Sequence, residues 1–416
     1  MKMGYNQTTI GEIPKDWEVI NLGKASPGVI GILAGYAFSS KYFNEKEGIP
    51  LIRIRDLGKN STEALYNGPF EDEYLVSPGE ILISMDGEFK AYVWRGPKGL
   101  LNQRVLKVWS KNEEYLDNLY LYYAIQKPLR IIELQVGQTT VKHLSTKHFD
   151  RITIPLPPIE EQRRIAEVLS GVDDAIRRVD LAIAKTERLK KGLMQKLLTE
   201  GIGHKEFKET KIGKIPKTWK IVRIKHIASV KEGIYGKRGE KGIIQLKADS
   251  ILDNGKINSN AYALITVNHR IDEYLLRPGD ILLSNRNSAN LVGKCAIFRG
   301  EFSECVFSNL LTRLRVHSKD IIPEWLLYVL MKMWHDGFFK SLSTRAVNQA
   351  LLRKGLVERL RVPIPPVSEQ QKIAEILSYV NKKFDLERMR KEKLVRIKKG
   401  LMGDLLTGRR RVKVAM

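Results

Sequence analysis

The sequence contains few of the residues from which disulfide-stapled, zinc-binding or membrane proteins are built. It has only two cysteines, Cys295 and Cys305, too few for a disulfide framework or a four-ligand zinc site. Its most apolar stretch, Ala25 to Phe38, is too short to span a bilayer and is interrupted by glycines. The first residues lack the apolar core of a signal peptide. Together these absences predict a protein of the reducing cytoplasm.

Motifs of the common catalytic and cofactor sites are also missing. There is no G-x-x-x-x-G-K-[ST] phosphate loop, no G-x-G-x-x-G dinucleotide fingerprint and no H-E-x-x-H among the seven histidines. The Pro-Pro pairs do not follow the Asn or Asp that opens the Asn-Pro-Pro-aromatic motif of adenine methyltransferases. Asp86, Glu88 and Lys90 give one faint match to a metal-dependent nuclease core. The sequence therefore predicts no catalytic residue, no metal ligand and no cofactor in this chain.

Positive charge is what the sequence has in excess. Seventy-one Lys and Arg against 47 Asp and Glu give a net charge of +24, which favours a polyanionic partner. Without a membrane segment, that partner is expected to be nucleic acid rather than an anionic membrane surface, although a merely soluble basic protein is an alternative. With 43% apolar residues in 416, the chain can fold two or three domains.

The chain repeats itself once, at about half its length. In four pairs of segments the second member follows the first by 200 to 208 residues, a period too long for a solenoid and indicative of a tandem duplication. The pairs are IGEIPKDWEVI (10–20) with IGKIPKTWKIV (212–222), DEYLVSPGEILIS (72–84) with DEYLLRPGDILLS (272–284), IPLPPIEEQRRIAEVLS (154–170) with VPIPPVSEQQKIAEILS (362–378), and KKGLMQKLLT (190–199) with KKGLMGDLLT (398–407).

The tail of each half is expected to be one long helix. Both tails begin at a Pro-Pro pair, 157–158 and 365–366, which is tolerated in a first turn and prevents the helix from extending further back. Apolar residues then alternate in steps of four and three, the heptad pattern of a coiled coil, until Gly201 and Gly408 end the two runs. The predicted seam consists of Ile165, Leu169, Val172, Ile176, Ile183, Leu193, Leu197, Ile373, Leu377, Val380, Phe384, Leu401 and Leu405.

Each such helix spans roughly 60 Å, and its apolar stripe needs a partner. The other copy is the expected partner, with weaker packing where Glu387 and Lys391 occupy seam positions. The alternative is that each helix packs only on the globular part of its own half. The C-terminal GRRRVK (408–413) is expected to be a frayed basic tail.

The globular parts combine short strands with helices, so the predicted fold class is mixed α+β. Strands are expected at 79–85 and 279–285, behind Pro-Gly turns, and at 51–57 and 243–249. Segments 117–126 and 323–334 are expected to be helices whose aromatic side chains belong to the core. The predicted segments are a globular domain over 1–155, a helix over 156–205, a second domain over 206–363 and a second helix over 364–416.

Two variable domains, each followed by P-x-P-P-x-x-E-Q-x-x-I and a heptad helix, closely resemble the DNA-specificity (S) subunit of type I restriction-modification systems. The resemblance covers nearly the whole chain, and its most specific parts are PLPPIEEQRRI and PIPPVSEQQKI. It implies two target-recognition domains that each read one half of a split DNA site, with the two helices paired antiparallel as a spacer. It also implies two methyltransferase subunits that use S-adenosylmethionine, and motor-nuclease restriction subunits that use ATP, as the partners that perform catalysis.

The same resemblance suggests where DNA is read: the loop after the P-G-(D/E)-I-L strand and the polar loop before the Pro-Pro helix. Arg and Lys there suit guanine edges or phosphates, and Asn and Gln suit adenine edges. For any one residue, a phosphate contact or a plain solvated loop is the alternative. The candidate DNA-binding residues are Arg53, Arg55, Lys90, Gln138, Thr139, Lys142, Lys247, Asn285, Arg286, Asn287, Arg345 and Asn348.

Two other functions remain open at this point. One is a self-contained site-specific nuclease or methyltransferase, which requires a metal or cofactor site that the sequence does not reveal. The other is a non-specific nucleic-acid-binding coiled-coil scaffold, which does not require two diverged domains. Binding to random duplexes, with and without methyltransferase partners, distinguishes the three.

Overall fold

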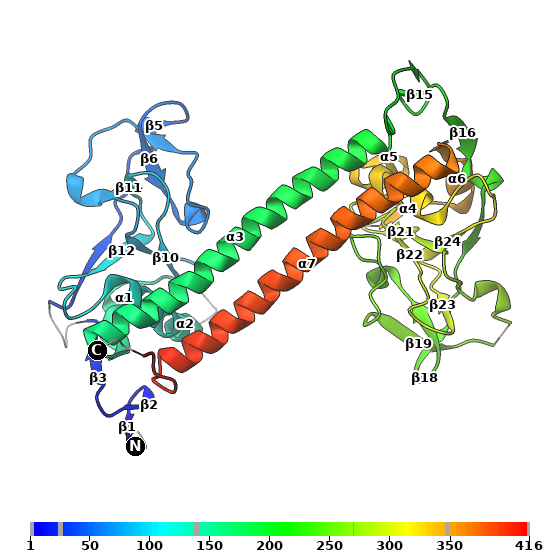
Figure 1. The fold of residues 1–416 in the computed structure, drawn as a ribbon. Helices are drawn as coiled ribbons and strands as arrows, with labels where there is room; N and C mark the ends of the chain where they lie inside the picture. The colour runs from blue at the N-terminus through cyan, green and yellow to red at the C-terminus, as the bar shows by residue number, and fades with distance from the viewer. Residues whose placement is uncertain (1–3, 24–27, 137–141, 269, 347–348, 414–416) are drawn as a thin grey trace. The chain divides into compact units, whose positions relative to one another are not determined.

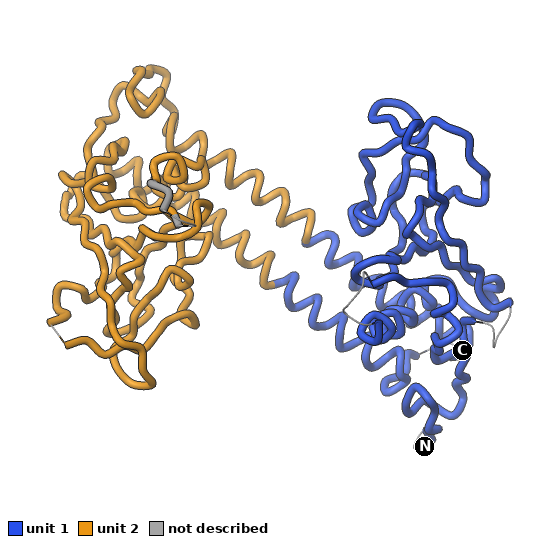
Figure 2. Tube along the Cα trace, turned by 180° about the vertical axis from the view of Figure 1, so that it is seen from behind, with its two compact units in different colours: residues 1–179, 390–416 blue, residues 180–389 orange. Residues whose placement is uncertain are grey.

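The computed structural model describes residues 4–23, 28–136, 142–268, 270–346 and 349–413. Two long helices, α3 (Ile159–Leu197) and α7 (Val367–Leu405), are its largest elements (Figure 1). The chain forms two units: unit 1 comprises Met1–Val179 with Arg390–Met416, and unit 2 comprises Asp180–Met389 (Figure 2). Each unit therefore contains part of both long helices. The unit boundaries fall inside α3 and α7 and not between the four consecutive segments that the repeat suggests.

Unit 1 is built on an antiparallel sheet of order β10-β9-β12-β4. A second sheet, of order β5-β7-β6-β11-β8, includes the parallel pair β6 and β11, and two further pairs are β1-β2 and β3-β13. The strands are β1 (Tyr5–Thr8), β2 (Gly11–Pro14), β3 (Glu18–Asn21), β4 (Ile30–Ala34), β5 (Phe43–Asn44), β6 (Ile49–Ile52), β7 (Leu65–Tyr66), β8 (Leu75–Val76), β9 (Ile81–Ser84), β10 (Ala91–Val93), β11 (Gly99–Leu101), β12 (Val105–Ser110) and β13 (Thr153–Leu156). The shorter helices are α1 (Asn118–Ala124) and α2 (Gln126–Gln135), with 3-10 turns η1 (Ser40–Tyr42), η2 (Ile54–Asp56), η3 (Asp72–Tyr74) and η4 (Thr146–Arg151).

Unit 2 repeats this framework with the antiparallel sheet β17-β24-β20-β22 and the pairs β14-β15 and β16-β27. It also has two three-stranded sheets, β19-β18-β23 and β21-β26-β25. The strands are β14 (Phe207–Lys208), β15 (Ile215–Pro216), β16 (Lys220–Arg223), β17 (Ala228–Glu232), β18 (Lys237–Leu246), β19 (Tyr262–Thr266), β20 (Ile281–Ser284), β21 (Arg286–Asn287), β22 (Cys295–Ile297), β23 (Cys305–Phe307), β24 (Leu311–Val316), β25 (Thr344–Ala346), β26 (Gln349–Leu351) and β27 (Arg361–Ile364). The shorter helices are α4 (Pro323–His335), α5 (Phe338–Leu342) and α6 (Lys354–Arg359), with 3-10 turns η5 (Ile224–His226), η6 (Ala248–Ser250) and η7 (Asp272–Tyr274).

The register of the central strands matches in the two units. Ser84 at the end of β9 lies opposite Val105 of β12, and Ser284 at the end of β20 lies opposite Leu311 of β24. The strands predicted behind the two Pro-Gly turns are therefore confirmed. The predictions for 51–57 and 243–249 were right only in their first part, because β6 and β18 end at Ile52 and Leu246 and a 3-10 turn follows each.

The main core of each unit includes the first turns of one long helix and the last turns of the other. In unit 1, Ile165 and Leu169 of α3 are buried beside Leu405 of α7, in one cluster with Trp17 and Tyr120. The mixed α+β class and the buried aromatic helices are confirmed. Because the start of one helix meets the end of the other, the helices run antiparallel within the unit.

Unit 2 has the corresponding arrangement. There, Ile373 and Leu377 of α7 are buried in one cluster with Leu197 of α3, Trp219 and Trp325. The first turns of each helix therefore pack on the domain that precedes them as well as on the other helix, which combines the two packing modes considered from the sequence. Of the remaining predicted seam residues, Val380 is buried, and the half-buried ones are Val172, Ile176, Ile183, Leu193, Phe384 and Leu401.

The predicted helix ends need one correction. The Pro-Pro pairs lie just before the helices rather than in their first turns, because the carbonyls of Pro158 and Pro366 accept the first helical N–H groups at 2.9–3.0 Å. Gly201 and Gly408 have φ values of 67° and 68° and reverse the chain after each helix. A Cβ on Gly408 would lie 2.4 Å from Cδ of Pro14, so both the conformation and the close approach require glycine there.

Two sequence-based exclusions concern membranes and thiols. In the described part of the chain, every helix is too short or too polar to serve as a membrane span. Cys295 and Cys305 are buried free thiols, and burial raises the pKa of both. Neither is therefore placed to act as a reactive thiolate.

Candidate nucleic-acid interface

In unit 1 the two loops predicted to read DNA lie against each other. The N–H of Leu144 donates to the carbonyl of Met85 at 2.7 Å, and the next residues outward, Asp86 and His143, form an antiparallel bridge. A third segment joins them, since the N–H of Met85 donates to the carbonyl of Arg104 at 3.0 Å. Side chains that lie 57 residues apart in the sequence thus form one surface.

Asp86 holds two side chains at this surface. Its Oδ2 accepts a hydrogen bond from Nη1 of Arg104 at 2.8 Å, and its Oδ1 lies 2.8 Å from Nδ1 of His143. Arg104 and His143 are 61% and 53% exposed, whereas Asp86 is 15% exposed. Because this carboxylate is already engaged twice, the arrangement does not support the nuclease-like pattern of Asp86, Glu88 and Lys90.

Unit 2 builds the same frame. The N–H of Leu352 donates to the carbonyl of Asn285 at 2.8 Å, and the N–H of Asn285 donates to the carbonyl of Leu310 at 3.0 Å. Outward of this point, Arg286 pairs with Leu351 in the β21-β26 ladder. The loop after the Pro-Gly strand and the loop before the Pro-Pro helix therefore meet in both units, at corresponding backbone positions.

Several predicted DNA-binding residues are exposed at these places. Arg286 is an exposed strand residue, Arg55 is exposed in η2, and Lys90 is exposed with its Nζ 5.4 Å from the ring centroid of Tyr92. The backbone of Arg345 lies in β25, opposite Ala350. Gln138, Thr139 and Asn348 lie outside the described residues.

Three predicted basic residues are tied to carboxylates and mostly covered. Arg53 donates to Asp56 at 3.3 Å, Lys142 lies 3.5 Å from Glu133, and Lys247 lies 3.1 Å from Asp249. Their side chains are 18%, 27% and 22% exposed, respectively. The two capping positions, 53 and 247, fix the 3-10 turns η2 and η6, which is a local structural role.

The two asparagines that follow β20 differ in placement. Asn285 is 3% exposed, and its Nδ2 donates to Oγ1 of Thr312 at 3.0 Å. Its predicted contact with a base is not supported, because its amide lies inside the loop and holds the loop to β24. Asn287 is half-buried, and its Nδ2 donates to Oγ of Ser284 at 3.2 Å.

Arg104 was missed by the sequence-based prediction. It lies outside both predicted loops, and the offset that aligns β12 with β24 is 206, whereas the one that aligns β9 with β20 is 200. Only the pairing of the strands shows that Arg104 adjoins the loop after β9. Inspection of the residue just before the strand that pairs with the Pro-Gly strand, β12 in unit 1, could have found it.

The E-Q pair of the repeated P-x-P-P-x-x-E-Q motif attaches each long helix to its domain. In unit 1, the side chain of Gln162 donates to the carbonyls of Tyr115 and Pro157 and accepts from the N–H of Asp117. In unit 2, Gln370 makes the matching bonds to Asp320, Pro365 and Ile322. The glutamine therefore satisfies backbone groups at the start of the domain's own helix, α1 or α4.

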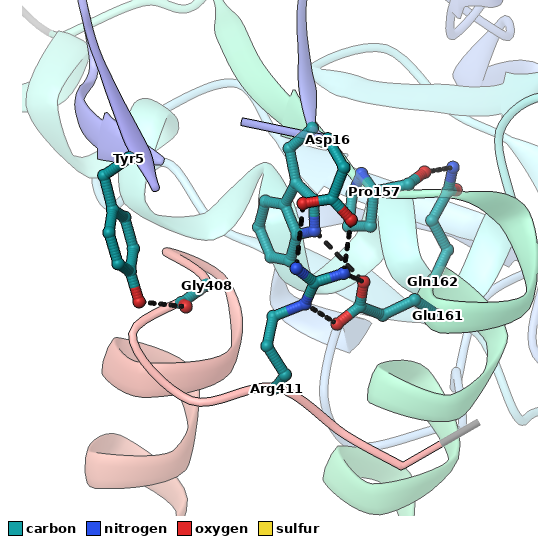
Figure 3. Close-up of polar contacts among 8 residues, drawn as sticks. Tyr5, Asp16, Pro157, Glu161, Gln162, Gly408 and Arg411 are labelled. Atoms are coloured by element: carbon teal, nitrogen blue, oxygen red, sulfur yellow. Dashed lines mark hydrogen bonds and ion pairs between the residues drawn. The ribbon is translucent and has the colours of Figure 1, made fainter. Parts of the chain in front are cut away.

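The glutamate of the motif binds the segment that follows the other long helix. Glu161 is 3% exposed, and its two carboxylate oxygens accept from Nε and Nη2 of Arg411, each at 2.6 Å (Figure 3). Nε1 of Trp17 also donates to Glu161 at 3.1 Å, and Arg411 forms a second bidentate pair with Asp16. Tyr5 completes the cluster by donating to the carbonyl of Gly408 at 3.3 Å.

Unit 2 has a corresponding junction with a different partner. Oε2 of Glu369 accepts from Nε1 of Trp219 at 3.1 Å, and Oε1 accepts from the N–H of Ile202 and lies 2.9 Å from Nε2 of His204. His204 follows Gly201 as Arg411 follows Gly408. The prediction of a frayed tail was therefore wrong for Arg411, because Arg411 occupies the position that His204 has after the first long helix.

The charges of the unit 1 junction reinforce one another. Hydrogen bonds to Glu161 and then to Asp16 raise the pKa of Arg411 above its usual value. The hydrogen bond from Arg411 lowers the pKa of Asp16 below 3.8. Arg411 is thus charged at any physiological pH, and its pairing with two carboxylates strengthens the attachment.

Comparison with known proteins gives a family. The family model described as the type I restriction modification DNA specificity domain matches residues 14–183 and again residues 216–396. The chain belongs to this family. Each match covers one of the two repeats and includes its paired loops and the first part of its long helix. Recognition of a DNA sequence is the role for which the family is described.

Individual members of the specificity family are similar over nearly the full chain. The specificity subunit of the type I restriction enzyme MjaVIII of Methanocaldococcus jannaschii is 30% identical over 410 residues, 96% of this chain and 94% of that protein. The specificity subunit of EcoBI of Escherichia coli is 29% identical over 372 residues, 83% of this chain and 76% of that protein. The crystal structure of the S subunit from M. genitalium has a TM-score of 0.64 at 15% identity, covers 94% of this chain and 96% of its own, and shares the fold.

Proposed function

We propose that this chain is the specificity subunit of a type I restriction-modification complex and that its two domains each read one half of a bipartite DNA site. Residues 1–155 and 206–363 are the target-recognition domains. The helical segments 156–205 and 364–416 set the spacing between the half-sites. The net charge of +24 fits a duplex partner. The proposed site of action is the reducing cytoplasm, in keeping with the low cysteine content.

One observation carries this proposal: a pair of loops with corresponding backbone hydrogen bonds in both units and different side chains beside them. Met85–Leu144 and Asn285–Leu352 are corresponding backbone hydrogen bonds. Beside them, unit 1 carries Asp86 where unit 2 carries Arg286. A shared frame with unrelated side chains is what two readers of different base sequences require.

The experiment that tests the proposal exchanges one domain. Replacing residues 1–150 by the same region of a relative is expected to change one half of the methylated sequence and leave the other half unchanged. The reason is that each domain contacts its own bases. Sequencing of methylated adenines in cells with the complex measures both halves at once. A change in both halves together would contradict the assignment of one domain to one half-site.

We further propose that catalysis belongs to methyltransferase and restriction subunits that assemble with this chain. An exposed apolar stripe on α7 within unit 2 supports a docking role for the long helices. Tyr379, Leu386 and Met389 are 72%, 62% and 58% exposed and share one face of the helix. Large apolar side chains gathered on one helix face commonly mark a protein interface.

Purified alone, the chain is expected to neither cleave nor methylate DNA in the presence of Mg²⁺, ATP and S-adenosylmethionine. Among the described residues, no group of three His, Cys, Asp or Glu side chains is placed to hold a metal ion. Adding the cognate methyltransferase subunits is expected to restore methylation and serves as the positive control. Turnover by the isolated chain that an exchange of one of its own residues abolishes would contradict this division of labour.

A further inference from the structure

Three positions on the recognition surface share one backbone frame and carry unrelated chemistry in the two units. In unit 1 all three are polar or charged, and in unit 2 one is an arginine and the other two are leucines. The backbone hydrogen bonds correspond in the two units, but Arg104 has a positive φ that Leu310 lacks, and the side chains differ at all three positions. Asp86, Arg104 and His143 of unit 1 correspond to Arg286, Leu310 and Leu351 of unit 2.

At these three positions each unit has one arginine, which comes from a different segment in each. In unit 2 it is Arg286, on the loop after β20. In unit 1 the matching loop position is Asp86, and the guanidinium comes instead from Arg104, immediately before β12. Asp86 accepts a hydrogen bond from Nη1 of that guanidinium. Among the described residues, the guanidinium of Arg104 makes no other hydrogen bond.

The backbone at Arg104 is unusual. Its φ of 70° lies in the left-handed region, and among described non-glycine residues only Asn60 shares a positive φ. That conformation costs free energy for an L side chain and is retained where the surroundings require it. Here it places a side chain that is 61% exposed beside a largely covered carboxylate. An arginine in a position that favours glycine indicates a requirement for the side chain itself.

We propose that Arg104 is the base-reading arginine of unit 1, oriented by Asp86, and that it recognises a guanine in the half-site of that unit. The proposal rests on the proposed function of the paired loops. The guanidinium fork matches O6 and N7 of guanine in the major groove. Fixing the fork in advance reduces the side-chain entropy lost on binding.

The neighbouring carboxylate argues for a base contact over a phosphate contact. Asp86 lies 2.8 Å from the guanidinium and offsets its charge, so a phosphate there would gain little attraction and would face a negative oxygen. Hydrogen bonding to guanine does not depend on net charge in the same way. Arg286 has no ion pair of this kind among the described residues, which leaves both kinds of contact open to it.

The test uses the full chain with its cognate methyltransferase subunits and the bipartite target found by methylation mapping. Arg104→Gly removes the side chain and relieves the left-handed backbone, so the variant is expected to fold at least as well as the parent. Arg164→Ala is the matched control, since Arg164 is an exposed arginine paired with Glu167 on α3. Binding is measured to duplexes that each carry one altered base pair.

The parent complex is expected to prefer G·C at one position of the unit 1 half-site by about 10- to 100-fold. Arg104→Gly is expected to lose that preference while keeping every preference in the other half-site, and Arg164→Ala to keep both. Asp86→Asn, which retains the arginine, is expected to weaken the preference at the same position. Arg286→Ala is expected to act only in the other half-site.

Three outcomes would overturn the proposal. One is unchanged discrimination in Arg104→Gly. Another is equal weakening on all duplexes with a shallower salt dependence, which marks a phosphate contact. The third is a combined result: Arg104→Gly loses sequence preference in both half-sites, while Asp86→Asn loses no preference at the predicted position. A parent complex without any sequence preference would instead contradict the proposed function itself.

Discussion

Residues 1–203 are expected to form an antiparallel homodimer and, with methyltransferase subunits, to methylate a palindrome made of the unit 1 half-site and its inverse. In the full chain, the end of α7 fills the unit 1 core next to Ile165 and Leu169. The end of α3 carries the same residues in the same order, so a second half-chain can supply them. The corresponding core residues are Met194 and Met402, Leu197 and Leu405, and Leu198 and Leu406.

The endpoint of the half-chain should matter. Residues 1–203 retain the seam but lack His204, the side chain that contacts the half-buried Glu369 in unit 2. Residues 1–208 include it and can offer it to Glu161 in place of Arg411. The longer half-chain, which also keeps Asp16 beside Glu161, is therefore expected to dimerise more tightly.

Sedimentation and methylation mapping check both expectations. Only monomer at roughly tens of micromolar, or methylation that still requires the asymmetric site, would count against the homodimer. Residues 206–416 are the comparison, and they are expected to dimerise less well. Glu387 and Lys391 occupy their seam, and Oε2 of Glu387 is buried without a hydrogen-bond partner among the described residues.

Arg411→Ala is expected to lower the free energy of unfolding of unit 1 by about 3–5 kcal/mol, the range for removing one partner of a buried ion pair. Among the described residues, it leaves the buried carboxylate of Glu161 with the Trp17 N–H as its remaining side-chain partner. The neighbouring Arg410→Ala is the control, because Arg410 is 78% exposed and lies 3.7 Å from Asp404. Its loss is expected to cost at most about 0.5 kcal/mol. Denaturant unfolding of the full chain measures both.

The double variant Glu161→Leu with Arg411→Leu separates charge from packing. Replacing both partners removes the unpaired carboxylate, so most of the lost stability is expected to return. Equal stability of Arg411→Ala and Arg410→Ala would show that the tail contributes nothing. Acid has a related effect, because Arg411 lowers the pKa of Asp16: the stability from their pairing is present at neutral pH and is lost as the pH falls below about 4.

The repeat predicted more of the fold than of the site. Repeated heptads and Pro-Pro pairs are local patterns, so the approximate extent of α3 and α7 and the burial of Ile165 and Ile373 could be predicted from the sequence. The sequence could not predict which part of each helix belongs to which unit. That division depends on which core the ends of α3 and α7 enter. That choice is made by tertiary contacts between residues far apart in the chain.

The functional residues were harder to predict because exposure and pairing decide them. Arg286 and Asn285 are adjacent in one loop, yet one is exposed and the other is 3% exposed with its amide bonded to Thr312. Arg411 looks like one of three arginines in a basic tail, but only it reaches Glu161. A charge pattern cannot distinguish such neighbours, since the difference is the direction in which each side chain points.

The discontinuity of unit 1 has a consequence for synthesis on the ribosome. Unit 2 is one continuous stretch, whereas the partner of Glu161 lies 250 residues further along the chain. At about 5–20 residues per second, that interval lasts roughly 12–50 s. During it, the apolar start of α3 can pack on the preceding domain but lacks the end of α7, which covers the rest of it in the native state. Unit 2 can therefore mature before unit 1, in the reverse of the order in which the two domains begin to emerge, and the nascent first domain is the part that needs protection from aggregation.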